Sequence, residues 1–279
     1  MIEFPKLSII IACYNDPDVV KAVKSASGQT YSNKEIILID DGSNEATKEA
    51  IRSIRNSISI LVEQKNQGQS IARNNGITRA TGKYILNLDS DDFFEPTFCE
   101  KAVKKFEEDE EVKIVSCGAN RFNKKGIIDV FIPKGGALKD FLFSNSALGS
   151  SMFKKEDWEK CGGYEEKLPI LGIEDWEFYI HILKGGGYAH VIPEMLFHYQ
   201  IRKNSTTDRI RDYRHEKFKQ IIYKHKDLYS ENFELTIAHF TSRLNKLESE
   251  KIRILEKADF KIGNILLKPL RLLKKGLKK

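Results

Sequence analysis

Three carboxylates stand within four residues in the segment Asp89-Ser90-Asp91-Asp92. Like charges this close repel one another, and a divalent cation relieves the repulsion. Oxygen donors with no cysteine or histidine nearby favour Mg²⁺ or Mn²⁺. Such an ion bridges the oxygens of a diphosphate and neutralises charge on a leaving group. A solvated turn is the alternative, but the apolar stretch 84–88 before the cluster favours a functional site at the end of a strand.

Two further acidic pairs can each be interpreted as a functional site or as a purely structural feature. Asp40-Asp41 ends another apolar stretch and is followed by glycine and serine. Glu174 and Asp175 stand where a helix is expected to begin. A carboxylate there either caps the helix and interacts with its dipole, or acts as a general base facing an acceptor hydroxyl. From this segment alone, capping is the favoured interpretation.

These side chains must be positioned by an α/β framework. Apolar runs predict strands at 7–13, 35–40, 58–62 and 84–88, and amphipathic segments predict helices at 18–27, 45–54 and 70–80. This alternation is typical of βαβ units in a parallel sheet. Later strands are expected at 112–117, 127–132, 188–192 and 195–199, and helices at 96–109, 155–160 and 175–184. Ligands of such sheets bind beyond the carboxyl ends of the strands, where the acidic clusters fall.

Composition indicates an ordinary globular chain. Of 279 residues, 41% are hydrophobic and 31% charged, which allows one large domain with an appendage. We expect neither a secretory signal nor a membrane-spanning helix, since no apolar run approaches ~20 residues. The four cysteines, Cys13, Cys99, Cys117 and Cys161, lack disulfide or metal spacing and are predicted to be reduced and buried. These features predict a cytoplasmic protein.

The net charge of +6 belongs to the end of the chain. Residues 261–279 hold seven of the 46 basic residues and no acidic one, so 39 basic residues face 40 acidic ones elsewhere. Isoleucine and leucine alternate with these charges. This pattern favours a helix lying on the inner face of an anionic cell membrane over a nucleic-acid contact. Pro269 is expected to interrupt that helix or to start its second half.

We predict a catalytic domain over 1–208 and a helical region over 209–279, with helices at 208–229 and 232–257. In the second of these helices, one set of apolar residues fits either a homodimer seam or packing on the domain: Leu244, Leu247, Ile252 and Leu255.

Several motifs occur in a fixed order and together resemble the family 2 glycosyltransferases of the GT-A fold: LSIIIACYN, DDGS, NQGQSIARNNGI, LDSDD, GGYEE, EDWEF and HYQIRKNSTT. The resemblance runs from residue 7 to about residue 207. It implies a Rossmann-like, mostly parallel central sheet flanked by helices. It also implies an inverting enzyme of the bacterial surface-polysaccharide type. The expected reaction moves a sugar from a nucleotide-sugar, with UDP favoured, to a hydroxyl of a carbohydrate or lipid-linked acceptor.

The resemblance also implies roles for single residues. Asp41, Ala12 and Tyr14 are expected around the nucleotide base, and Arg73 on the diphosphate or sugar. Asp89 and Asp91 are expected to bind the ribose and the Mg²⁺ or Mn²⁺ ion, with Asp91 the direct ligand and Asp92 an extension of the cluster. Asp175 matches the catalytic base, with Glu174 beside it.

The acceptor side and the last motif are less regular. Residues 146–164 are expected to form the acceptor wall. Trp158 and Trp176 could stack on a sugar ring, although packing in the core is favoured. Many relatives carry a histidine where this chain has Arg202. Arginine cannot ligate a cation, but it clamps phosphate bidentately, so Arg202 and Lys203 are expected to bind diphosphate, and His198 to be structural.

Two other functions remain open. A sugar nucleotidyltransferase shares an α/β fold and acidic metal sites, although its glycine-rich N-terminal loop is missing here. A non-catalytic nucleotide-sugar-binding scaffold is the other alternative, and the retained acidic residues argue against it. A dehydrogenase is disfavoured because no GxGxxG follows the first strand.

Overall fold

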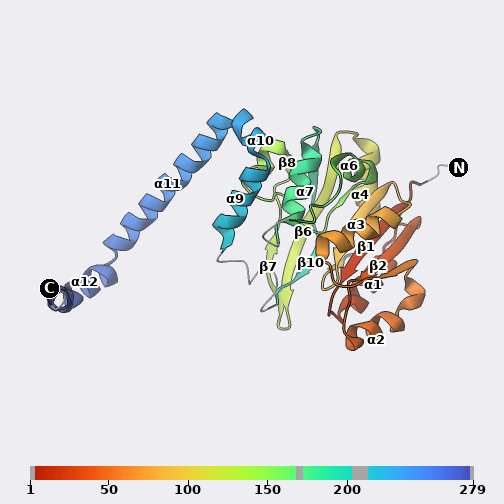
Figure 1. The fold of residues 1–279 in the computed structure, drawn as a ribbon, viewed down its shortest axis with the longest axis horizontal. Helices are drawn as coiled ribbons and strands as arrows, with labels where there is room; N and C mark the ends of the chain where they lie inside the picture. Colours follow the sequence, from red (N-terminus) through yellow and green to blue (C-terminus); the bar gives the residue numbers. More distant parts are fainter. Residues whose placement is uncertain (1–3, 168–171, 203–212, 277–279) are drawn as a thin grey trace. The chain divides into compact units, whose positions relative to one another are not determined.

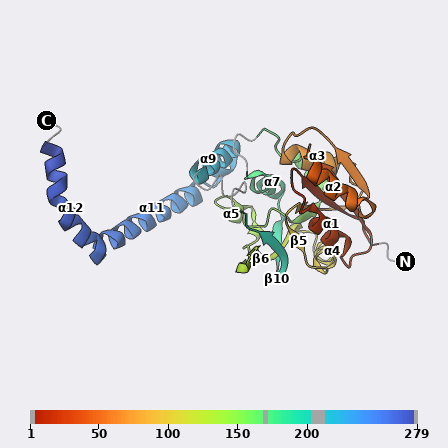
Figure 2. The ribbon, with the colours of Figure 1, turned by 90° about the horizontal axis from the view of Figure 1, so that it is seen from below.

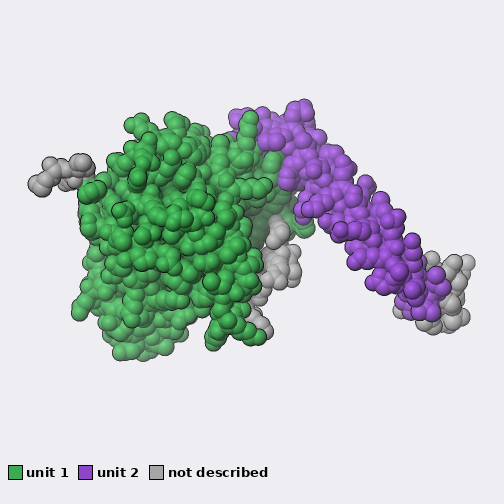
Figure 3. Space-filling view, turned by 180° about the vertical axis from the view of Figure 1, so that it is seen from behind, with its two compact units in different colours: residues 1–221 green, residues 222–279 purple. Residues whose placement is uncertain are grey.

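The computed structural model describes residues 4–167, 172–202 and 213–276. The chain forms two compact units, Met1–Ile221 and Ile222–Lys279, which Figure 3 colours separately. The expected domain boundary at Asp208 lies outside the described residues.

The first half of the first unit is a parallel sheet flanked by helices (Figures 1 and 2). Its strands run in the order β3-β2-β1-β4 and are β1 (Leu7–Cys13), β2 (Lys34–Asp40), β3 (Ile60–Glu63) and β4 (Tyr84–Asp89). The helices are α1 (Val19–Ser27), α2 (Glu45–Ser53), α3 (Gln69–Arg79) and α4 (Phe98–Glu108), with the 3₁₀ turn η1 at Arg55–Ser57. β1, β2 and β4 read as continuous apolar runs because both sheet faces are buried. The predicted elements are confirmed to within about two residues.

The second half extends this sheet with mixed pairing. Its strands are β5 (Phe93–Phe94), β6 (Val112–Asn123), β7 (Gly126–Phe131), β8 (Gly136–Ala137), β9 (Met152–Lys154) and β10 (Tyr188–Gln200), and its helices are α5 (Leu138–Phe141), α6 (Lys155–Cys161) and α7 (Glu174–Leu183). β9 is antiparallel to both β4 and β6, so it joins the two halves of the sheet. β6 and β10 form a long parallel pair.

Two sequence predictions need correction here. The strands expected at 188–192 and 195–199 are one strand, β10, whose register shifts between Ile192 and Met195. Pro193 lies in this gap and has no N–H for the ladder, so the pairing with β6 is interrupted and then resumes. The strand expected at 112–117 continues to Asn123, because β7 pairs with its second half.

Close packing of α3 on the sheet fixes the position of that helix. A Cβ on Gly76 would lie 2.5 Å from Ile39 Cδ1 and 2.8 Å from Ile10 Cγ2. Only glycine leaves room for this approach. The helix therefore holds its first turns at the carboxyl ends of β1 and β4, where the acidic clusters lie.

The cysteines are free thiols, as predicted. Cys13, Cys99 and Cys117 are buried and Cys161 is half-buried. Burial raises the pKa of the Cys13 thiol to about 12, so this side chain is an inert core residue.

The last part of the chain is helical. Its elements are α9 (Arg214–Lys224), in which the boundary between the units falls, α10 (Lys226–Glu231), α11 (Phe233–Glu256) and α12 (Ala258–Gly276). The expected interruption at Pro269 is wrong, because α12 spans this position and the break comes at Lys257, whose backbone is extended. Proline lacks a backbone N–H and so removes one hydrogen bond from the helix. The hydrogen bonds of the neighbouring turns hold the helix together across this position. Over the described ranges, no helix is both long and apolar enough to cross a membrane.

Candidate active site

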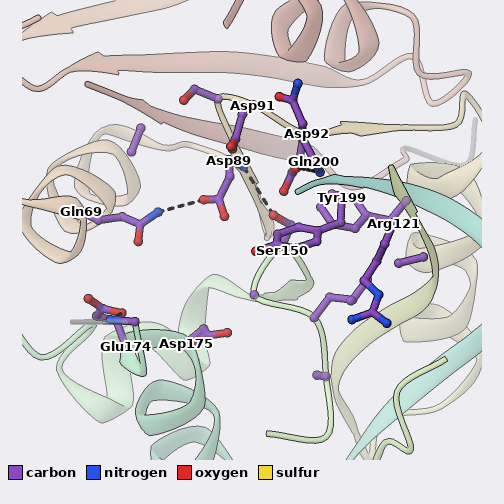
Figure 4. A pocket seen from close by; sticks show the side chains of 18 of the residues that line it. Gln69, Asp89, Asp91, Asp92, Arg121, Ser150, Glu174, Asp175, Tyr199 and Gln200 are labelled. Atoms are coloured by element: carbon purple, nitrogen blue, oxygen red, sulfur yellow. Dashed lines mark hydrogen bonds between the residues drawn. The ribbon is translucent and has the colours of Figure 1, made fainter. Parts of the chain in front are cut away.

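A cavity of about 420 Å³ opens at the carboxyl ends of β1 and β4 (Figure 4). The start of α3, the middle of β6, the end of β10 and the first turn of α7 complete its wall. Seven of the predicted site residues line it: Ala12, Arg73, Asp89, Asp91, Asp92, Glu174 and Asp175. The acidic cluster at 89–92 and the acidic pair at 174–175 are more than 80 positions apart in the sequence, and they share one cavity.

Asp89 is held by α3. The Arg73 guanidinium is only 4% exposed, and its Nη2 donates to Asp89 Oδ1 at 2.6 Å. Gln69 Nε2 donates to the same oxygen at 2.9 Å. Asp89 thus has its charge balanced by protein, which makes it a weaker metal ligand than its neighbour Asp91.

Asp91 is the carboxylate best suited to a cation. Burial, together with the charge of Asp89, raises its pKa to about 6, although the guanidinium of Arg202 acts in the opposite sense. Burial also raises the pKa of Asp92 well above its usual range, and the Oδ2 of Asp92 is buried without a partner. A cation in the cavity would relieve both groups.

The donor set fits a loosely held hard cation. Over the described part of the chain, no three metal-binding side chains converge. Mg²⁺ and Mn²⁺ are commonly held by one or two carboxylates, with substrate phosphates and water completing the shell. Asp91 and a bound diphosphate would supply that arrangement.

Asp175 lies in the first turn of α7 and accepts a hydrogen bond from Asn145 Nδ2 at 2.8 Å. Burial raises its pKa to about 6; Arg73 lowers this pKa, whereas Glu174 and Asp89 raise it. A general base works best with a pKa near the operating pH, so burial gives Asp175 a suitable value. Glu174 instead accepts the backbone N–H of Gly172 at 2.7 Å; Gly172 precedes α7, so this contact orders the loop before the helix and does not cap the helix.

Asp41 and Tyr14 do not line the cavity. The carboxylate of Asp41 is buried and accepts three hydrogen bonds, from Gln64 Nε2 and from the backbone N–H groups of Gln67 and Gly68. It thereby fixes the loop that leads into α3. Tyr14 is exposed just beyond β1. Base binding by both residues stays a prediction.

Arg202 lies next to the cavity rather than in its wall. Its guanidinium contacts three carboxylates, with Nη1 3.1 Å from Asp16 Oδ1, Nη2 2.9 Å from Asp18 Oδ2 and Nε 3.4 Å from Asp91 Oδ2. A diphosphate clamp by Arg202 stays a prediction, and Lys203 lies outside the described residues.

The histidine and the two tryptophans have packing roles. His198 stacks on Phe93 and has Nε2 2.7 Å from Glu95 Oε1, as expected of a structural histidine. The Trp176 indole donates to the Phe141 carbonyl at 2.6 Å and stacks on Phe218, and Trp176 does not line the cavity. Trp158 Nε1 donates to Asn74 at 3.2 Å. The favoured interpretation, packing, describes both tryptophans.

Several lining residues had not been singled out from the sequence. They are Gln69, Ser90, Ala119, Arg121, Phe131, Phe197, Tyr199 and Gln200. Gln69 stands inside the NQGQSIARNNGI motif and could have been found there, whereas Arg121 has no motif. Residues 147–150 also line the cavity, within the segment expected to form the acceptor wall.

Comparisons with known proteins agree with this geometry. The family model "Glycosyl transferase family 2" matches residues 8–155, and a second model, "N-terminal domain of galactosyltransferase", matches residues 141–216. The first match covers more than half of the chain. The chain therefore belongs to glycosyl transferase family 2.

Two of the relatives differ in how much of their own length this chain covers. The chain is 30% identical over 225 residues to UDP-Glc:alpha-D-GlcNAc-diphosphoundecaprenol beta-1,3-glucosyltransferase WfaP of Escherichia coli, with 77% of this chain and 82% of WfaP covered. It is 27% identical over 228 residues to glycosyltransferase GlyA of Streptococcus pneumoniae, with 74% of this chain but only 32% of GlyA covered.

Solved structures show the fold. The mannosyltransferase PcManGT from Pyrobaculum calidifontis, in complex with GDP-Man and Mn²⁺, matches with a TM-score of 0.63 at 18% identity, covering 95% of this chain and 84% of that one. S. aureus TarS 1–349 in complex with UDP-GlcNAc matches with a TM-score of 0.61 at 17% identity. That match covers 72% of this chain and 60% of TarS 1–349. The fold is GT-A, as the resemblance implied.

Proposed function

We propose that this glycosyltransferase transfers a sugar from UDP-sugar to a hydroxyl of a lipid-linked carbohydrate with inversion at the anomeric carbon, in a reaction that requires Mg²⁺ or Mn²⁺. The observation that carries the proposal is that Asp175 and Asp91 line the same cavity. Asp175 is the candidate for the general base, and Asp91 is the candidate for the cation ligand. The name of the relative WfaP, which includes both a UDP-sugar and a diphosphoundecaprenol acceptor, supports the choice of substrates.

The proposed reaction is a single displacement. Asp175 takes the proton of the acceptor hydroxyl while the acceptor oxygen forms a bond to the anomeric carbon. The bond from that carbon to the diphosphate oxygen breaks, and the nucleoside diphosphate leaves with the electron pair. Asp91 would hold a Mg²⁺ or Mn²⁺ ion, which would neutralise the charge of the leaving diphosphate.

The remaining wall residues orient these groups. Arg73 balances the charge of Asp89 and lowers the pKa of Asp175, so it favours the ionised form of the candidate base. Asn145 donates to Oδ2 of Asp175 at 2.8 Å and so fixes the orientation of this carboxylate. Orientation of this kind supplies a large part of the rate enhancement of displacement reactions.

Product analysis tests the reaction class. Incubation with Mn²⁺ and a panel of UDP-, GDP- and dTDP-sugars should release a nucleoside diphosphate, most from the UDP donors. Pyrophosphate release would support a sugar nucleotidyltransferase instead. Absence of any release, with donor-dependent thermal stabilisation retained, would support a binding scaffold.

The location of the enzyme is a further part of the proposal. A cytoplasmic protein that contacts the anionic inner face of the cell membrane through residues 261–279 would meet lipid-linked acceptors there. Exposed Ile262, Ile265 and Leu266 on α12 support this. Vesicle co-sedimentation with and without residues 261–279 tests it, and equal binding would contradict it.

Homodimerisation through α11 is proposed because Leu244, Leu247, Ile252 and Leu255 are exposed. Sedimentation velocity should show a dimer that Leu244→Asp dissociates; a monomer at all concentrations would contradict the seam.

A further inference from the structure

The hairpin of β6 and β7 carries an apolar surface of which only Phe131 lines the active-site cavity. All six residues of β7 are exposed. The apolar side chains concerned are Ile127, Ile128, Val130, Phe131 and Ile132, which are 42–63% exposed. The hairpin projects from the lower edge of the first unit in the view of Figure 1. Five apolar side chains that are exposed together on one hairpin indicate an interaction surface.

The charge of the hairpin indicates its partner. Residues 121–134 contain four basic residues, Arg121, Lys124, Lys125 and Lys134, and one acidic residue, Asp129. Asp129 is ion-paired with Arg121, so its charge is already balanced. Lys124 and Lys125 form the exposed turn between the strands. Apolar side chains flanked by lysines complement an anionic lipid surface.

A second copy of the chain fits this surface less well. Among the described strands, β7 pairs only with β6, so its outer edge could in principle accept another strand. Such pairing would satisfy the backbone along one edge. Successive side chains of a strand point to opposite faces, so Ile127 and Ile128 would both stay in water. A lipid interface can take up both faces of a projecting hairpin.

The surface is continuous with the active-site cavity. Phe131 at the end of β7 and Arg121 on β6 both line the cavity. A lipid-bound hairpin would therefore hold the cavity close to the headgroups.

We propose that the β6–β7 hairpin docks on an anionic lipid bilayer and presents lipid-linked acceptors to the cavity. The lipid contact stands on the hairpin itself, whereas the presentation of the acceptor rests on the proposed function. This contact belongs to the catalytic unit and is separate from the one proposed for residues 261–279.

Fluorescence of the full chain carrying Ile128→Trp tests the contact locally. Vesicles of phosphatidylglycerol and brominated phosphatidylcholine should quench the introduced indole at least about twofold, because the hairpin enters the interface where the quencher lies. The unmodified chain is the control, since Trp158 and Trp176 are hydrogen-bonded within the fold. Lys124→Gln with Lys125→Gln, added to this variant, should reduce the quenching. The proposal would be overturned if the Ile128→Trp chain pellets with the vesicles but its fluorescence is quenched no more than that of the unmodified chain.

Turnover separates this proposal from the proposed function. Ile128→Asp should leave nucleoside diphosphate release with a water-soluble acceptor unchanged and reduce transfer to an acceptor in anionic vesicles at least about tenfold, the loss expected from one apolar side chain. Equal transfer in the vesicles would overturn the hairpin contact while the enzyme assignment stands. If the Ile128→Trp chain is quenched by the vesicles but no nucleoside diphosphate is released with any acceptor, the proposed function is contradicted and the hairpin contact stands. A dimer that Ile128→Asp dissociates would assign the surface to a second copy.

Discussion

Replacement of Arg73 by methionine should change both the stability and the pH dependence of this enzyme. The guanidinium is 4% exposed and its partner Asp89 has a side chain that is 27% exposed. Removal of one member of a buried pair costs about 3–5 kcal/mol, because the other charge is left without compensation. Since Asp89 is partly solvated and keeps the hydrogen bond from Gln69, we expect about 2–3 kcal/mol. That loss corresponds to a fall in Tm of roughly 5–10 °C.

The second effect of Arg73→Met concerns Asp175. Arg73 lowers the pKa of Asp175, so its removal should move that pKa above 6. A base acts in its deprotonated form, and activity falls as the pH drops through its pKa. The acid limb of kcat/KM should therefore move to higher pH in Arg73→Met.

Thermal unfolding and a pH profile of initial rates check both effects. Arg79→Met is the matched control, since Arg79 is an exposed arginine on the same helix. It should change neither quantity. An Arg73→Met enzyme with the Tm and the acid limb of the unmodified protein would refute the role given to this ion pair.

Three further predictions follow from the same geometry. In the unmodified enzyme, kcat/KM should fall about tenfold for each pH unit below about 6, the value to which burial raises the pKa of Asp175, and a flat profile would contradict its role as the base. Asp91→Asn should weaken Mn²⁺ binding in the presence of UDP at least about tenfold by calorimetry, and unchanged binding would remove Asp91 as the ligand. Gly76→Ala should destabilise the fold by about 1–3 kcal/mol, because its Cβ would meet Ile39, and denaturant unfolding measures this; Gly263→Ala is the control, because a Cβ there meets nothing within 4 Å.

The sequence was most informative where burial is complete. β1 and β2 are buried on both faces, so each contains a run of consecutive apolar residues, 9–13 and 36–39, that marks the strand directly. The sequence predicts two strands where the structure has the single strand β10, because Pro193 interrupts the ladder. β7 was correctly expected as a strand, but its apolar run gave no sign that the strand is exposed. Hydrophobic pattern predicts which residues form a strand more reliably than it predicts what covers the strand.

The active site also has features that the sequence predicts and features that it does not. The family resemblance predicts that Asp41, Asp91 and Asp175 surround one cavity; Asp91 and Asp175 line it, whereas Asp41 does not. Local spacing could not show that both oxygens of Asp41 bind the loop before α3, because Gln67 and Gly68 reach Asp41 only in the folded chain.

The contacts of Arg202 were equally out of reach of the sequence. Asp16, Asp18 and Asp91 belong to two loops far apart along the chain, and they meet around one guanidinium only after folding. Contacts between distant loops leave no trace in residue spacing.

The central claim is that Asp175 accepts the proton of the acceptor hydroxyl, and that binding of the donor in the cavity does not depend on Asp175. Asp175→Asn, which keeps the size of the side chain, tests this claim most directly when donor affinity is measured by calorimetry and transfer by release of nucleoside diphosphate. The account predicts an affinity within about twofold of the unmodified enzyme and a transfer rate at least about 100-fold lower. Transfer at the rate of the unmodified enzyme would contradict the account.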